Sequence, residues 1–187
     1  MPHGAIIGLT SSGKTFLARS LARGFMTAKF PSQGLKVLAL RKRRETWMDD
    51  ECDFQTSDPE LFIQQYKQQA KINWENGTHS VAFLELSDAD AAKYDKRFRK
   101  LFTEGRHDGF RFFYLAQRGA MVHPDIRENC VSLYLFTCGG DAAKTWSEEF
   151  CDKELLKAAT LPARCFMHKA SRYSPAQMRT LSVKTKS

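Results

Sequence analysis

The chain has 187 residues, of which 42% are hydrophobic and 12% aromatic, so it suits one globular domain with a sizeable core and excludes a disordered chain. Its formal net charge of +8 favours a polyanionic partner, although a basic globular protein without such a partner has the same balance. No apolar run approaches the roughly 20 residues of a membrane-spanning helix, and Met1-Pro2-His3 leads straight into an apolar segment rather than a signal peptide.

The first expected elements are a short apolar strand at residues 5–7 and a helix beginning near Phe16. Between them stands a match to the P-loop pattern G-x-x-x-x-G-K-[ST], formed by Gly8, Leu9, Thr10, Ser11, Ser12, Gly13, Lys14 and Thr15. Glycines in such a loop let backbone N–H groups surround phosphate oxygens, and the helix N-terminus adds a positive dipole end. Lys14 is expected to reach the β- and γ-phosphates, and the Thr15 hydroxyl to bind Mg²⁺. The sequence therefore predicts that residues 8–16 bind ATP with Mg²⁺.

Further along the chain, apolar runs alternate with helical patterns. A helix start is expected at Ser57-Asp58-Pro59-Glu60, where the proline falls in the first turn. The stretch 46–56 and the loop containing Pro124 are expected to be irregular. Strands are expected at 35–40, 80–86, 110–116 and 131–136, with an edge strand at 164–168, and helices at 61–72, 91–103, 141–150 and 153–160. This order predicts an α/β fold in one domain (residues 1–170) with a central, mainly parallel sheet flanked by helices, followed by a basic tail (171–187).

A P-loop needs an acidic partner at the end of another strand to hold Mg²⁺ and orient water. The apolar run 81–84 leads to two candidates, Glu85 and Asp88. Such a strand usually ends in two adjacent acids, whereas here Ser87 precedes Asp88 and Leu86 follows Glu85. We expect Asp88 to polarise the attacking water and Glu85 to assist Mg²⁺ through a water molecule. The alternative is that either residue is only a charge at the end of a strand.

Four consecutive cations, Arg41 to Arg44, follow the second expected strand, and a charged helix includes Lys93 to Lys100. These cations could contact the phosphates of a nucleic acid, or they could form a solvated surface. Trp47 could stack on a base, but a half-buried tryptophan is the simpler interpretation. The five cysteines lack C-x-x-C spacing and are expected to be reduced thiols of a cytosolic protein.

The middle of the chain carries a connected pattern: Thr103-Glu104-Gly105-Arg106-His107-Asp108-Gly109, an apolar strand that leads into Ala116-Gln117-Arg118, and Pro124-Asp125-Ile126-Arg127-Glu128-Asn129. Together with the P-loop, this pattern resembles the FtsK–HerA group of DNA-translocating ATPases. Within that group it is most similar to the genome-packaging ATPases of tailless, membrane-containing double-jelly-roll viruses. The resemblance extends from about Gly4 to Phe136. It implies a RecA/ASCE-like ATPase domain and a head-to-tail ring, usually a hexamer, that passes DNA through its central channel.

The resemblance also implies roles for three further side chains. Gln117 would sense the γ-phosphate or position the attacking water, and otherwise it is a polar cap at the end of a strand. Arg106 matches the arginine that enters the neighbouring subunit's site, where it would stabilise charge on the transferred phosphoryl group; otherwise it is a solvated arginine. Arg127 matches a second arginine, which could be a further finger or an interface residue.

On this resemblance, the chain is expected to package a viral genome into a preformed capsid by ATP-driven DNA translocation. Its expected partners are DNA, other copies of the chain in the ring, and the capsid vertex or portal proteins. Its expected location is the host cytoplasm during assembly, with retention in the virion left open. Three other functions stay open: a small nucleotide or metabolite kinase, a phage assembly or export ATPase, and a nucleotide-gated structural protein at a capsid vertex. A missing arginine-rich lid argues against the first, and a missing membrane helix argues against the second.

Overall fold

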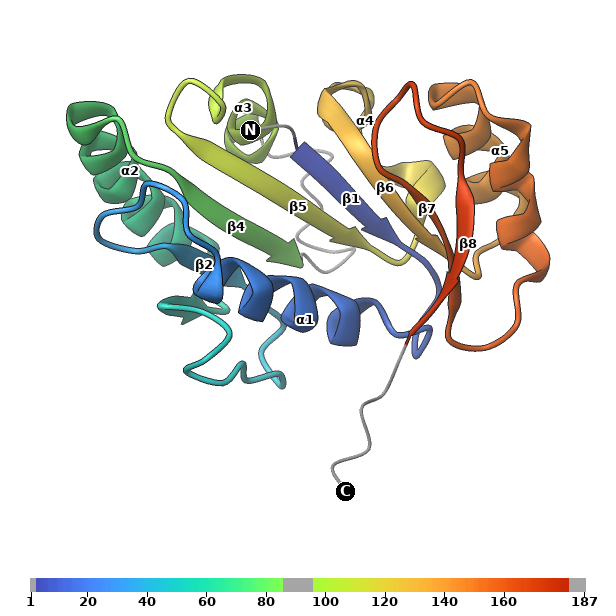
Figure 1. Cartoon of the computed structure of the whole chain (residues 1–187), viewed down its shortest axis with the longest axis horizontal. Coiled ribbons are helices and arrows are strands. Elements are labelled where there is room, and N and C mark those ends of the chain that lie inside the picture. Colours follow the sequence, from blue (N-terminus) through green and yellow to red (C-terminus); the bar gives the residue numbers. More distant parts are fainter. Residues whose placement is uncertain (1–2, 86–95, 182–187) are drawn as a thin grey trace.

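The computed structural model describes residues 3–85 and 96–181, and the strands of these residues form one eight-stranded sheet (Figure 1). The strands are β1 (His3–Ile7), β2 (Val37–Leu40), β3 (Phe54–Thr56), β4 (Ser80–Glu85), β5 (Phe110–Ala116), β6 (Cys130–Phe136), β7 (Cys165–Lys169) and β8 (Gln177–Thr180). Their order across the sheet is β3-β2-β4-β5-β1-β6-β7-β8. From β3 to β6 all neighbours are parallel, whereas β7 runs antiparallel to both β6 and β8. The predicted α/β fold with a mainly parallel sheet is therefore confirmed.

One face of the sheet is covered by α1 (Lys14–Thr27), which crosses in front of the strands in Figure 1. Leu17 of this helix is buried in one hydrophobic cluster with Phe83 of β4 and Phe113 of β5. The rings of Phe83 and Phe113 stack, with their centroids 5.0 Å apart. Such an aromatic pair contributes about 1 kcal/mol beyond the burial of its area. The cluster thus fixes the helix that follows the P-loop against the strands that lie beside it.

The opposite face packs against the remaining helices. These are α2 (Pro59–Asn76), α3 (Lys96–Glu104), α4 (Pro124–Asn129) and α5 (Gly140–Glu149), with the 3₁₀ segments η1 (Gly119–Met121) and η2 (Lys153–Thr160). In Figure 1, α2 lies at the left of the sheet and α5 at its right. Phe62 of α2, Phe102 of α3 and Trp146 of α5 are all buried here. Because successive strand residues face opposite sides, covering both sides requires strands that are apolar throughout. Among the described residues, no helix combines the length and apolar composition needed to cross a bilayer.

The predicted start of α2 is confirmed in detail. Asp58 is the N-cap, and its side chain accepts a hydrogen bond of 2.9 Å from the N–H of Glu60. Pro59 occupies the first turn, where its missing N–H leaves no helical bond unmade. The helix ends at Gly77, whose φ of +62° is the left-handed conformation that favours glycine.

β3 and α4 are two of the short elements that were not expected. β3 lies in the stretch that was predicted to be irregular, and it is held to β2 by Asp53, whose Oδ2 accepts hydrogen bonds from the N–H groups of Lys36 (2.7 Å) and Val37 (2.8 Å). α4 lies in the predicted loop around Pro124, because proline suits the first turn of a helix as well as a loop. A side chain one residue earlier, His123, accepts a hydrogen bond from the N–H of Asp125 at 3.2 Å.

β8 is the outermost strand on one side of the sheet, next to β7. β8, at Gln177–Thr180, lies within the stretch expected as a basic tail and pairs with β7, the expected edge strand. Residues 182–187 of that tail lie outside the described residues. The five cysteines are free thiols, and of these only Cys151 is exposed. Trp47 is buried rather than half-buried, and its ring lies 5.4 Å from that of Phe83.

Candidate nucleotide-binding site

The P-loop connects the carboxyl end of β1 to the N-terminus of α1, as the sequence predicted. The N–H of Gly8 donates to the carbonyl of Ala116 (3.1 Å), and the N–H of Leu9 donates to the carbonyl of Thr137 (2.9 Å). These bonds tie the loop to the ends of β5 and β6, the two neighbours of β1. Gly13 has a φ of +106°, and Ser11 a φ of +60°. Both are left-handed conformations that bend the loop back before the helix begins.

Lys14 lies beneath this loop and is 5% exposed. Its Nζ donates a hydrogen bond of 2.7 Å to the carbonyl of Leu9. Burial lowers the pKa of Lys14 from 10.5 to about 8, and the carboxylate of Glu85 opposes that shift. A buried cation at a helix N-terminus is a suitable binding group for the phosphates of a nucleotide.

A pocket of about 330 Å³ opens over the P-loop. Its walls are formed by Thr10, Ser11, Gly13, Lys14, Thr15 and Phe16 of the loop and helix, and by Lys42, Glu45, Glu85 and Gln117. Glu85 ends β4 and Gln117 follows β5, and β5 lies between β4 and β1. The structure therefore brings Glu85 and Gln117 to the predicted ATP site, because the carboxyl ends of neighbouring parallel strands meet at one edge.

Two side chains that were not predicted to be in this pocket come from the turn after β2. Lys42 forms an ion pair with Glu85, with 3.1 Å between Nζ and Oε1. The carboxyl group of Glu45 contacts that of Glu85, and burial together with the charge of Glu85 raises the pKa of Glu45. The sequence did place Arg41 to Arg44 at the end of a strand. It did not show that this strand, β2, pairs with β4, which is the relationship that brings the turn to the pocket.

The oxygen atoms of this pocket fit a divalent cation. The carboxylates of Glu85 and Glu45 and the hydroxyl of Thr15 are ligands that Mg²⁺ prefers. The Oε2 atoms of both glutamates are buried and have no hydrogen-bond partner. Over the residues that the structure describes, no cluster of three or more His, Cys, Asp or Glu side chains could hold a metal alone. Mg²⁺ is commonly bound by one or two carboxylates together with the phosphates of a nucleotide. Asp88, the other predicted acid, lies outside the described residues.

The two arginines of the family pattern lie at the amino ends of the parallel strands, whereas the pocket lies at their carboxyl ends. Arg106 is exposed in the turn before β5, whereas Gln117 follows the same strand. The seven residues of β5 span about 23 Å, so Arg106 is far from the P-loop of its own chain. Arg127, on α4, precedes β6 and lies at the same amino edge as Arg106.

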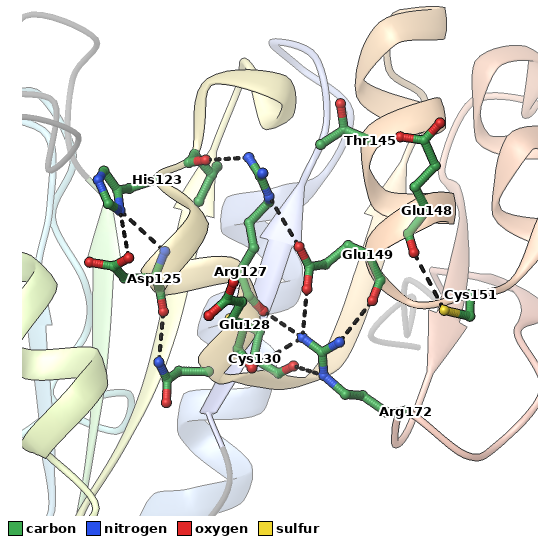
Figure 2. Close-up of polar contacts among 12 residues, drawn as sticks. His123, Asp125, Arg127, Glu128, Cys130, Thr145, Glu148, Glu149, Cys151 and Arg172 are labelled. Atoms are coloured by element: carbon green, nitrogen blue, oxygen red, sulfur yellow. Dashed lines mark hydrogen bonds and ion pairs between the residues drawn. The ribbon is translucent and has the colours of Figure 1, made fainter.

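Arg127 is held within its own chain, as Figure 2 shows. Its Nη1 donates to the carbonyl of Val122 at 2.6 Å, and its Nε lies 3.4 Å from Oε2 of Glu149 on α5. Glu149 also pairs with Arg172, whose guanidinium donates to the carbonyls of Cys130, Arg127 and Glu128. The carboxylate of Glu149 thus joins the end of α4 to the turn between β7 and β8.

A scan against models of protein families finds no match for this chain, and a search of curated proteins finds none either. Solved structures do match. The DNA-packaging ATPase B204 from Sulfolobus turreted icosahedral virus superposes with a TM-score of 0.70 over 97% of this chain and 98% of that chain, at 16% identity. The genome-packaging NTPase B204 from Sulfolobus turreted icosahedral virus 2, in complex with ATP-gammaS, gives a TM-score of 0.71 over 97% and 98% of the two chains, at 13% identity.

A second group of matches comes from secretion ATPases. The cytoplasmic domain of the type VII secretion ATPase EccC from Thermomonospora curvata matches 98% of this chain and 24% of its own, with a TM-score of 0.67 and 12% identity. The resemblance inferred from the sequence motifs is confirmed by these neighbours, which are a viral genome-packaging ATPase and FtsK-like ATPase domains. At such low identities the likeness establishes the fold, which is that of a P-loop ATPase.

Proposed function

We propose that this chain is an ATPase that couples ATP hydrolysis to the movement of viral DNA into a preformed capsid. The observation that carries the proposal is the assembly of Lys14, Thr15, Glu85 and Gln117 around one pocket, in a chain whose fold matches a DNA-packaging ATPase over nearly its whole length. A P-loop alone indicates nucleotide binding. An acid and a glutamine on two neighbouring strands are the additional groups that hydrolysis requires.

In the proposed reaction, a water molecule attacks the γ-phosphorus of ATP. The bond from that phosphorus to the β,γ-bridging oxygen breaks, which yields ADP and phosphate. The Lys14 ammonium and the N–H groups of the P-loop would stabilise charge on the phosphate oxygens, and Gln117 would orient the water. Asp88 is the proposed acid that polarises this water. Mg²⁺, when bound near Thr15 and Glu85, supplies further neutralisation of the phosphate charge.

Arg106 supports a ring in which each site lies between two subunits. In a head-to-tail ring, one surface patch of each subunit meets a different patch of the next. In the proposed ring, the amino ends of the strands of one subunit face the carboxyl ends of the strands of the next. Arg106 could then reach the nucleotide of the neighbour, although it is too far from its own. We propose such a ring, with six subunits as the expected number, and a central channel for DNA. Arg43 and Arg44, which are exposed beside the pocket, are candidate contacts for DNA phosphates.

The proposed partners beyond DNA are the capsid vertex or portal proteins, and the proposed location is the host cytoplasm during assembly. The proposal is tested by measuring the ATPase rate against DNA concentration while recording the oligomer mass on the same sample. We expect turnover to rise with DNA and with ring formation. A monomer that hydrolyses ATP at one rate with and without DNA would overturn the motor. Transfer of phosphate to one of a panel of small acceptors would instead identify a kinase.

A further inference from the structure

The turn after β2 brings two charged side chains to the carboxylate of Glu85. The N–H of Glu45 donates to the carbonyl of Lys42 at 3.1 Å, so the turn is closed and its two side chains enter the pocket together. The residues that follow this turn are held to β3. The side chain of Gln55 accepts a hydrogen bond from the N–H of Trp47 (2.9 Å) and donates one to the carbonyl of Trp47 (2.8 Å). Lys42 and Glu45 are therefore placed by the fold, since β2 and β4 are hydrogen-bonded neighbours.

The single ammonium of Lys42 pairs with only one oxygen of the two carboxyl groups of Glu85 and Glu45. Glu85 is 5% exposed, and of its two oxygens only Oε1 is paired, with Lys42. Its Oε2, like that of Glu45, is buried without a hydrogen-bond partner. Two carboxyl groups in contact repel each other whenever both are ionised. A buried arrangement of this kind is stabilised when a cation lies between the two carboxylates.

We propose that Glu45 joins Glu85 in holding the divalent cation that accompanies the nucleotide, and that Lys42 neutralises Glu85 until this cation binds. The cation would lie on the side of the pocket where the Thr15 hydroxyl and the phosphate oxygens complete its oxygen coordination. This inference rests on the nucleotide-binding part of the proposed function. It is independent of DNA, ring formation and hydrolysis. It also explains how the pocket can hold two carboxylates although β4 ends at Glu85 and the sequence continues with Leu86 rather than a second acid.

The two variants Glu45→Gln and Lys42→Gln should change metal-dependent binding in opposite directions. Without metal, Glu45→Gln removes a negative charge near the triphosphate, so ATP should bind as well as in the wild type or more tightly. With Mn²⁺, the same variant loses a ligand, and ATP should bind at least tenfold more weakly. Lys42→Gln removes the cation that competes for Glu85, and it should increase the tightening of ATP binding by Mn²⁺.

The experiment is a titration of the full chain with ATP, once in EDTA and once in Mn²⁺. Calorimetry measures the affinity for ATP, and the electron paramagnetic resonance of free Mn²⁺ measures how much metal is bound. Glu75→Gln, an exposed glutamate on α2, is the matched control and should leave both affinities unchanged. Equal Mn²⁺ dependence in the wild type and Glu45→Gln would overturn the assignment of Glu45 and leave the proposed function standing. If Glu45→Gln does not fold, Glu45→Asp should give a smaller loss of the same sign. A wild-type chain that binds no ATP in either buffer would overturn the proposed function itself.

Discussion

The side chain of Leu181 lies directly against Gly13 of the P-loop: its Cδ1 is 2.4 Å from the position that a β-carbon on Gly13 would occupy. Leu181 follows β8, and its N–H donates to the carbonyl of Arg164 at 2.9 Å. Leu181, the last residue that the structure describes, therefore packs on the P-loop at residues 8–15. The sheet edge formed by β7 and β8 supports the nucleotide pocket from the side.

Gly13→Ala should destabilise the protein, because the new β-carbon meets Leu181 and because a φ of +106° is strained for alanine. The two effects together should lower the free energy of unfolding by roughly 2–4 kcal/mol, measured by urea denaturation. Leu181→Ala in the same chain should relieve the clash but not the backbone strain. Strictly additive effects of the two substitutions would mean that the two residues do not touch.

The affinity for ATP should fall at alkaline pH, because the phosphates bind the ammonium form of Lys14 and its pKa in the free protein is about 8. We expect about a tenfold loss per pH unit above that value, measured by calorimetry at low Mg²⁺. Lys14→Arg keeps its charge over this range, so any residual ATP binding should not vary with pH. A wild-type affinity that is constant from pH 7 to pH 10 would contradict the expected proton loss.

The stability of the nucleotide-free protein should rise with pH over the alkaline range in which the affinity for ATP falls. The pKa of Lys14 is lower in the folded chain (about 8) than the ordinary 10.5, so the unfolded chain binds the additional proton. The cost of burying this ammonium is therefore fully present below pH 8, and it disappears as the pH rises toward 10.5. Chemical denaturation of the wild type and Lys14→Met should show a pH-dependent difference only in that window. Parallel curves would show that Lys14 titrates normally.

Arg106→Ala should still form rings but lose ATP turnover by on the order of 10³-fold, because the arginine would serve the neighbouring site. Lys14→Ala should be inactive because its own pocket cannot hold the phosphates. Mixing the two inactive variants should restore part of the activity, since some interfaces then combine an intact P-loop with an intact Arg106. Lys144→Ala, an exposed cation on α5, is the control and should keep wild-type turnover. Mixtures that stay inactive although mixed rings form would argue against a finger acting between subunits.

Arg127→Ala should lower the free energy of unfolding by about 1–3 kcal/mol, because it leaves the carbonyl of Val122 without its donor and removes one of the two cations beside Glu149. Thermal and urea denaturation would measure the loss. Arg127→Lys should recover part of it. Unchanged stability with abolished turnover would instead favour Arg127 as a second finger.

Much of the site could be predicted because its signals are local in the sequence. The P-loop follows a strand and precedes a helix within twelve residues, and Glu85 and Gln117 each follow an apolar run directly. The start of α2 was predictable because Asp58 and Pro59 act on their nearest backbone neighbours, whereas its end was expected at residue 72 and lies at Asn76. β3, α4 and β8 were missed because they are short, and their stability comes from contacts with distant segments. One example is the pair of hydrogen bonds that Asp53 accepts from the N–H groups of Lys36 and Val37 at the start of β2.

The sequence by itself determined that residues 8–15 form a P-loop between a strand and a helix, because that loop needs only glycines, a lysine and a threonine at fixed spacing. It also determined an α/β fold, because the alternation of apolar runs and helical patterns is a local property. The tertiary structure alone decided that Lys42 and Glu45 enter the nucleotide pocket and that Leu181 rests on Gly13. These contacts depend on which strands are neighbours in the sheet, and that order is set by the packing of the whole chain.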